Sequence, residues 1–210
     1  MVLKLKKGLD LKKGLEASYL NPKEAKTYLS KEGYVYDSEL SNVNSKVYYN
    51  PDDKDLLIAY RGSKNILNDW LTTDLSIPFG GLRNTKRYNE SLNVYKKAKD
   101  KYHSDPHDQV NQLNQTTLIG DSLGGSLASA VGGTDKKSKI YSFNKGTGLF
   151  GNDTNNKSNE VAFRQSGDVV SGFSVFNHNK PITLGARMDP LSAHNINNLE
   201  KYNINIYKKV

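Results

Sequence analysis

The 210-residue sequence contains no cysteine, a single tryptophan and two methionines. Without cysteine the chain has no disulfide, no thiolate metal ligand and no cysteine nucleophile. It also lacks any apolar run near the roughly 18 residues of a membrane-spanning helix, and its lysine-containing N-terminus lacks the apolar core of a signal peptide. We therefore expect a protein that is cytoplasmic or packaged in a particle such as a virion, rather than secreted through a signal peptide.

Positive charge is in excess, because 30 Lys and Arg stand against 22 Asp and Glu and give a formal net charge of +8. The length suits one domain with a sizeable core. The charge favours solubility or attraction to an anionic lipid surface. Nucleic-acid binding is the weaker alternative, because no known nucleic-acid-binding motif accompanies the charge. The sequence sets no expectation for the oligomeric state.

The first 20 residues are interpreted as a basic N-terminal arm, with the domain spanning residues 21–210. The arm contains Leu-Lys-Lys-Gly-Leu twice, at residues 5–9 and 11–15. The alternative, which the residues of this segment favour, is a frayed or domain-packed terminus. Further along, residues 84–102 are expected to form a helix with an apolar stripe and a lysine-rich opposite face, which is a candidate contact for anionic headgroups.

A buried strand, a tight turn and a small-residue helix are predicted around Ser122. Residues 116–119 form a β-branched apolar run, which indicates a strand. The next five residues, Gly120-Asp121-Ser122-Leu123-Gly124, match G-x-S-x-G, the pattern of a nucleophile elbow between strand and helix. Glycine on both sides is expected because a Cβ there would clash with neighbouring backbone. We predict that Ser122 is a nucleophile.

A second loop is predicted to complete an oxyanion hole. Arg61-Gly62-Ser63 follows the apolar run of residues 56–60, at the strand end where open α/β sheets place their sites. An acyl-transfer site needs two N–H groups aimed at the oxyanion. We expect one from Leu123, directly after the nucleophile, and one from Ser63. Arg61 is expected to hold this loop by pairing with a carboxylate.

The residues after this loop are a candidate lid. Ile66, Leu67, Trp70 and Leu71 fall at helical spacing. A short amphipathic segment beside an oxyanion loop is typical of a lid that opens onto lipid. A surface helix with Trp70 packed inward is an equal alternative.

Three segments together resemble the class 3 (fungal-type) lipase family. They are residues 57–63 with Arg-Gly-Ser, residues 69–75 with Asp-Trp, and residues 118–125 with Gly-Asp-Ser-Leu-Gly-Gly. The resemblance covers roughly Tyr28 to His194. It implies an α/β-hydrolase fold, with a central, mostly parallel sheet flanked by helices in a small single domain. It also implies hydrolysis of carboxylic esters of lipids. Asp121 departs from the family, which usually has histidine there.

The remaining members of a triad are expected after Ser122, in the order acid and then histidine. Only His178 and His194 follow the serine, and we favour His194, at the start of an expected C-terminal helix. Asp168 is the preferred acid because it lies at a strand end and Gly-Asp-Val-Val resembles the acid motif of the family. Asp153, in an Asn-rich loop, and Asp189, before a proline, are weaker candidates.

No cofactor or metal is expected for this chemistry. The run His103-Ser104-Asp105-Pro106-His107-Asp108 contains potential ligand types, but proline breaks the helix that would align them. We interpret this run as an exposed loop.

Two further interpretations stay open beside the hydrolase. Gly120-Asp121-Ser122-Leu123 also spells the signature of GDSL esterases, in which the motif lies near the N-terminus and an Asp-x-x-His pair lies at the far end; here Asp189 and His194 are five residues apart. The other is a catalytically weak or inactive lipase-fold protein with a structural or binding role, for example in a virion.

Overall fold

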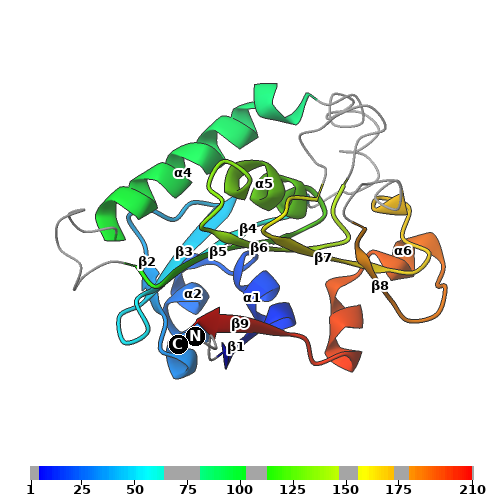
Figure 1. Cartoon of the computed structure of the whole chain (residues 1–210), viewed down its shortest axis with the longest axis horizontal. Coiled ribbons are helices and arrows are strands. Elements are labelled where there is room, and N and C mark those ends of the chain that lie inside the picture. The colour runs from blue at the N-terminus through cyan, green and yellow to red at the C-terminus, as the bar shows by residue number, and fades with distance from the viewer. Residues whose placement is uncertain (1–4, 64–80, 103–112, 147–155, 173–179, 210) are drawn as a thin grey trace.

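The computed structural model describes residues 5–63, 81–102, 113–146, 156–172 and 180–209 (Figure 1). At its centre is a seven-stranded sheet in the order β2-β3-β4-β5-β6-β7-β8. Strands β4 to β8 are parallel, and β2 and β3 add an antiparallel edge. The strands are β2 Val35–Asp37, β3 Ser45–Asn50, β4 Asp55–Tyr60, β5 Gln115–Asp121, β6 Lys139–Phe143, β7 Glu160–Gln165 and β8 Ile182–Leu184.

Helices cover both faces of the sheet. One face carries α4 and α5, and the other carries α1, α2 and the short ribbon β1-β9 (Figure 1). The α-helices are α1 Leu11–Ala17, α2 Pro22–Tyr28, α4 Lys86–Tyr102, α5 Ser122–Gly132 and α6 Pro190–Ala193. Short 3-10 helices are η1 Ser30–Glu32, η3 Leu82–Asn84 and η5 Ile196–Lys201, and the ribbon pairs β1 Leu5–Asp10 with β9 Asn205–Lys209. The predicted α/β class, with a mostly parallel sheet flanked by helices, is confirmed.

The apolar run of β4 serves both faces. Leu56, Ile58 and Tyr60 pack in the core beneath α4 and α5. Leu57 and Ala59, which point the other way, pack in the core with α1 and α2. A strand buried on both faces reads as a continuous apolar run rather than an alternating one, which is why this segment was recognisable from its sequence.

The N-terminal residues are part of the domain. Leu11 and Leu15 are fully buried, and a Cβ added to Gly14 would lie 2.7 Å from Ile119 Cδ1, so α1 lies directly against β5. The Asp10 side chain caps α1 by accepting from the Lys13 N–H at 2.9 Å. Residues 5–20 are therefore not a separate arm. The packed terminus, the alternative that the sequence left open, is what the structure has for them.

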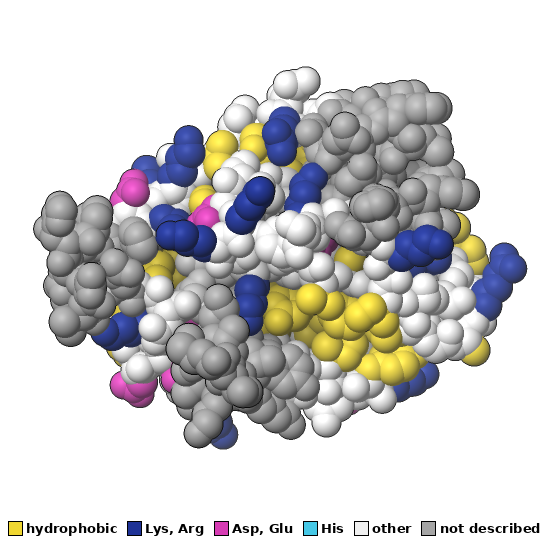
Figure 2. All heavy atoms as spheres, viewed as in Figure 1, with side chains coloured by type: hydrophobic (Ala, Val, Ile, Leu, Met, Phe, Trp, Pro, Cys, Tyr) yellow, Lys and Arg dark blue, Asp and Glu magenta, His cyan; other side chains and the backbone are white. Residues whose placement is uncertain are grey.

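Helix α4 has the predicted two-faced character. It buries Tyr88, Tyr95 and Ala98, and Lys and Arg side chains gather over its outer face (Figure 2). Two of its lysines pair with carboxylates outside the helix, Lys99 with Asp135 and Lys101 with Asp37, and Lys86 pairs with Glu90 within it. Contact of the remaining basic face with lipid stays a prediction. Across the described part of the chain, no helix is both long enough and apolar enough to cross a membrane.

Candidate active site

Ser122 lies at the junction between β5 and α5, in a strained backbone conformation. Its φ of 51° falls in the left-handed region, which a non-glycine residue adopts only at a cost. A Cβ at Gly120 would lie 2.2 Å from the Gly124 carbonyl carbon, and a Cβ at Gly124 would lie 2.2 Å from the Tyr60 carbonyl oxygen. Neither backbone contact can move aside, so both glycines are required. This is the strand-turn-helix geometry of a nucleophile elbow.

The turn after β4 lies beside the elbow. Tyr60 of β4 is in register with Gly120 of β5 in the parallel pair, so both strands deliver their next residues to the same edge of the sheet. Gly62 approaches Asp121 so closely that an added Cβ would lie 3.1 Å from the Asp121 carbonyl oxygen. Ser63 and Leu123, the predicted oxyanion donors, thus belong to two turns in contact. Their role stays a prediction.

Asp168 is a buried carboxylate with hydrogen-bond donors to both of its oxygens. It is 1% exposed and follows the end of β7. Its oxygens accept from the N–H groups of Val170 (3.2 Å) and Ser171 (3.1 Å) and from the Ser171 hydroxyl (2.5 Å). Asp168 Oδ1 also lies 2.7 Å from His194 Nδ1. The preferred acid and the preferred base are therefore in direct contact.

His194 is 6% exposed, and its second ring nitrogen, Nε2, is buried without a hydrogen-bond partner among the described residues. The expectation that it starts a C-terminal helix is wrong. It lies in the turn after α6, because Asn195 caps the following 3-10 helix by accepting from the Asn197 N–H at 2.9 Å. The alternative acid Asp189 is exposed and accepts from the Ser192 N–H at the start of α6.

Asn144 was not singled out from the sequence, yet it ties this edge together. It is fully buried directly after β6, with φ at 45°. Its Nδ2 donates to the carbonyl of Ala193 (2.8 Å), the residue before His194. Its Oδ1 accepts from the N–H of Gln165 (2.8 Å) at the end of β7. Asparagine tolerates the left-handed region, and an asparagine just after a buried strand was the available signal.

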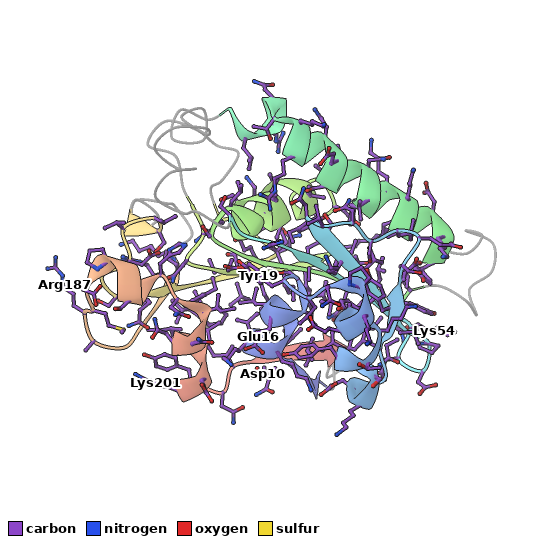
Figure 3. All side chains as sticks on the ribbon, turned by 180° about the vertical axis from the view of Figure 1, so that it is seen from behind. Asp10, Glu16, Tyr19, Lys54, Arg187 and Lys201 are labelled. Carbon is purple, nitrogen blue, oxygen red and sulfur yellow. The ribbon has the colours of Figure 1, made fainter. Side chains whose placement is uncertain are left out.

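Asp121, which stands beside the nucleophile, is held by the N-terminal part of the chain. Tyr19 donates its hydroxyl hydrogen to Asp121 Oδ2 (2.7 Å) and accepts from the Gly62 N–H (3.2 Å). In Figure 3, Tyr19 is nearer to the central sheet than Glu16 and Asp10 are. Asp121 Oδ1 is buried without a partner among the described residues. Burial raises the pKa of Asp121, and the Tyr19 hydrogen bond and the proximity of His194 oppose that rise.

The expected pairing of Arg61 with a carboxylate is wrong for the residues that the structure describes. Its guanidinium carbon lies 5.2 Å from the centre of the Tyr19 ring, a cation-π arrangement. The loop is held through its backbone instead. The Arg61 N–H donates to the Asn44 carbonyl at 2.9 Å, and the Arg87 guanidinium donates to the Arg61 carbonyl.

A buried ion pair lies behind the elbow helix. Lys145 Nζ is 2.8 Å from Glu160 Oε1, and both side chains are almost fully buried. The hydroxyls of Ser129 (2.7 Å) and Ser142 (2.6 Å) donate to the same carboxylate. The pair thus fastens α5 to β6 and β7, and sequence reasoning missed it because no local pattern marks it.

Several predicted features fall on residues outside the described ranges. They are the candidate lid at Ile66, Leu67, Trp70 and Leu71, the run of residues 103–108, and the weaker candidates Asp153 and His178. In the described ranges, no cluster of three or more His, Asp or Glu side chains has the arrangement to hold a metal ion.

Neither a protein-family model nor a curated protein matches the sequence. Solved structures do match the fold. A fungal lipase superposes with a TM-score of 0.54 at 11% identity, over 95% of this chain and 84% of the other. The Lip2 lipase of Yarrowia lipolytica gives 0.51 at 12% identity, over 91% and 85%. Lipase II of Rhizopus niveus gives 0.52 at 13% identity, over 78% and 74%.

The chain has the fungal lipase fold. The resemblance drawn from three short motifs is confirmed at this level, and at 11–13% identity the likeness shows the fold alone. Within the lipase fold, the described site brings together Asp168 and His194 by hydrogen bond, and the Gly62 and Ser122 turns by the close approach of Gly62 to Asp121.

Proposed function

We propose that the chain is a serine ester hydrolase of the lipase or phospholipase type that cleaves carboxylic esters of lipids. The observation that carries the proposal is the 2.7 Å hydrogen bond between Asp168 and His194 Nδ1, at the edge of the sheet that carries the strained Ser122. Because Asp168 occupies Nδ1, the nitrogen left for proton transfer is Nε2, which is buried and has no partner among the described residues. That nitrogen takes the serine proton in a Ser-His-Asp triad; in this structure it forms no hydrogen bond with Ser122 Oγ, and catalytic hydrogen bonds often tighten only when substrate binds.

In the proposed reaction, each of these residues has one role. Ser122 Oγ attacks the ester carbonyl while His194 Nε2 takes its proton. The carbonyl oxygen becomes an oxyanion that accepts from the N–H groups of Leu123 and Ser63. The tetrahedral intermediate collapses to the acyl-enzyme, and His194 returns the proton to the leaving alcohol. A water molecule, deprotonated by His194, then attacks the acyl-enzyme, and the acid leaves as His194 returns that proton to Ser122 Oγ. Asp168 orients the imidazole and stabilises its charged form.

The lipid part of the proposal is supported by the shared fold, since the solved neighbours include a triacylglycerol lipase. The basic face of α4 supports docking on an anionic surface. The competing function is a structural or binding role on the same fold. The 5% exposure of Ser122 favours it, because a nucleophile must reach its substrate.

A fluorophosphonate probe separates the two functions. We expect covalent labelling of the wild type and of Ser158→Ala, which alters an exposed serine, and none of Ser122→Ala. Hydrolysis of p-nitrophenyl esters from butyrate to palmitate and of phospholipid vesicles is expected to fall by about 10⁴-fold or more in Ser122→Ala. Equal rates for wild type and Ser122→Ala would leave only the structural role.

A further inference from the structure

A cavity of about 460 Å³ lies beside the turn that follows β4, with Arg61 of that turn in its lining. Its volume is in the range of small-molecule sites. Its lining includes the side chains of Tyr19 and Arg61 but neither Ser122 nor Leu123. The cavity is therefore distinct from the candidate active site, to which Arg61 connects it through the turn at Gly62 and Tyr19 through its hydrogen bond to Asp121.

Two cations line this cavity and face no anion within it. Lys46 is 3% exposed, and its Nζ donates to the Asn42 carbonyl at 2.7 Å. Arg61 has a buried Nε without a partner among the described residues. In the described part of the chain neither side chain forms an ion pair, and no carboxylate is among the residues that line the cavity. Burial lowers the pKa of Lys46, and the nearby charge of Arg61 lowers it further.

A buried Lys46 beside the charge of a half-buried Arg61 is costly unless an anion joins them. The other lining groups match a ligand with an anionic head and a partly apolar body. Ser38 and Ser41 offer hydroxyls, and Tyr36 and Val43 offer apolar surface. A phosphate monoester carries about −1.5 to −2 charges near neutral pH and several strong acceptor oxygens. It therefore balances two cations better than a carboxylate with one charge, and the planar guanidinium suits its oxygens.

We propose that this cavity binds the phosphate monoester group of a small molecule or of a lipid headgroup, with Lys46 and Arg61 as its charged contacts. The proposal does not depend on the hydrolase. Because Arg61 stacks on Tyr19, whose hydroxyl joins Gly62 to Asp121, a bound phosphate is placed next to the groups that support the predicted oxyanion loop.

The test is calorimetric titration of Ser122→Ala protein, which cannot turn over an ester, with glycerol 3-phosphate and with inorganic phosphate. Vesicles of phosphatidylcholine with and without phosphatidic acid form a second arm. Saturable binding of glycerol 3-phosphate indicates a soluble ligand, and binding only to the phosphatidic acid vesicles indicates a lipid headgroup. In either arm, Lys46→Met and Arg61→Gln are each expected to weaken binding by about tenfold or more.

The matched control is Lys201→Gln, which removes one exposed positive charge at the end of η5, away from the residues that line the cavity and from α4, and is expected to bind as the parent does. Circular dichroism and a thermal melt establish that each variant is folded. Absence of saturable binding in both arms overturns the proposal. So does binding that survives both cavity variants, or binding that Lys201→Gln weakens as much as they do.

Discussion

Asp121 and Asp168 lie near the carboxyl ends of parallel strands and are buried to a similar degree, at 5% and 1% exposure. Their surroundings differ. Asp168 has partners for both oxygens, from two N–H groups, a hydroxyl and His194. Asp121 has one side-chain donor, Tyr19, and one oxygen without a partner among the described residues. A buried carboxylate surrounded by donors is suited to remain charged, whereas one with a single donor is not.

The comparison separates two uses of a buried acid. The Asp168 region presents a fixed negative charge to an imidazole. The Asp121 region connects the elbow to the N-terminal part of the chain, through Tyr19, and to the turn at Gly62. We therefore expect the first region to govern the rate of the reaction and the second to govern the stability of the edge.

The largest expected effect is that of Asp168→Asn on ester hydrolysis. The substitution keeps the shape of the side chain but removes the charge that stabilises the imidazolium, so we expect kcat to fall by about 10⁴-fold. The measurement is kcat and KM on a soluble ester such as p-nitrophenyl butyrate. The matched control is Asp189→Asn, which changes an exposed aspartate a few positions before His194 in the sequence. This variant is expected to retain wild-type activity. A loss in Asp189→Asn with activity kept in Asp168→Asn would instead favour the GDSL-type pairing of Asp189 with His194.

Asn144→Ala tests whether the tether to the histidine turn matters. It leaves the Ala193 carbonyl and the Gln165 N–H without their buried partner, and we expect destabilisation of about 2–4 kcal/mol in urea unfolding. Because Asn144 positions His194 without touching substrate, kcat is expected to fall while KM changes little.

The control for Asn144→Ala is Asn203→Ala. Asn203 also has a positive φ, at 46°, but is exposed, so its substitution carries the backbone strain without the lost tether. We expect a cost of only about 1 kcal/mol there. Equal costs in both variants, with kcat unchanged in both, would assign Asn144 to backbone conformation alone.

How much of this edge was predictable depends on how local its contacts are. Ser122, Gly120 and Gly124 were found because the strand, the turn and the helix are formed by consecutive residues, so the local sequence specifies all three. Asp168 and His194 were found from strand-end position and chain order. The helix expected to start at His194 was wrong, because the four-residue helix α6 ends just before it and the next helix begins only after Asn195, its N-cap. These signals needed no knowledge of tertiary contacts.

The Tyr19 contact was not predictable, because it joins residues 102 positions apart in the chain. No periodicity or motif specifies such a pair. The same reason explains why the sequence left both a basic arm and a packed terminus open for the first residues. Leu9, Leu11 and Leu15 of the repeated Leu-Lys-Lys-Gly-Leu segments are core residues, because Gly14 lets α1 approach β5 and β9, from the other end of the chain, pairs with β1.

Tyr19→Phe removes the group that joins the two turns while keeping the ring beneath Arg61. The Gly62 N–H and Asp121 Oδ2 both lose a partner, so we expect destabilisation of about 1–2 kcal/mol in urea unfolding. Tyr28→Phe is the matched control. Its hydroxyl donates to Glu16 at 2.5 Å in a half-buried setting, where water replaces the lost bond and the expected change is about 0.5 kcal/mol. A larger loss in the control than in Tyr19→Phe would remove the special role of the Asp121 region.

The smallest expected effect, opposite in sign, is that of Asp121→Asn on thermal stability. Burial raises the pKa of Asp121 above its unfolded value of about 3.9. The folded chain therefore holds this proton to higher pH than the unfolded chain does, and stability is lost as the pH rises through the raised pKa. Asparagine cannot ionise and can still accept from Tyr19, so the variant is spared that loss. We expect Tm to rise by about 2–4 °C at pH 7, the shift that roughly 1 kcal/mol produces in a chain of this length, and the gain to vanish near pH 3. A gain that does not depend on pH would mean that ionisation of Asp121 is not its cause, and a loss at pH 7 would mean that the fold stabilises the charged form of Asp121.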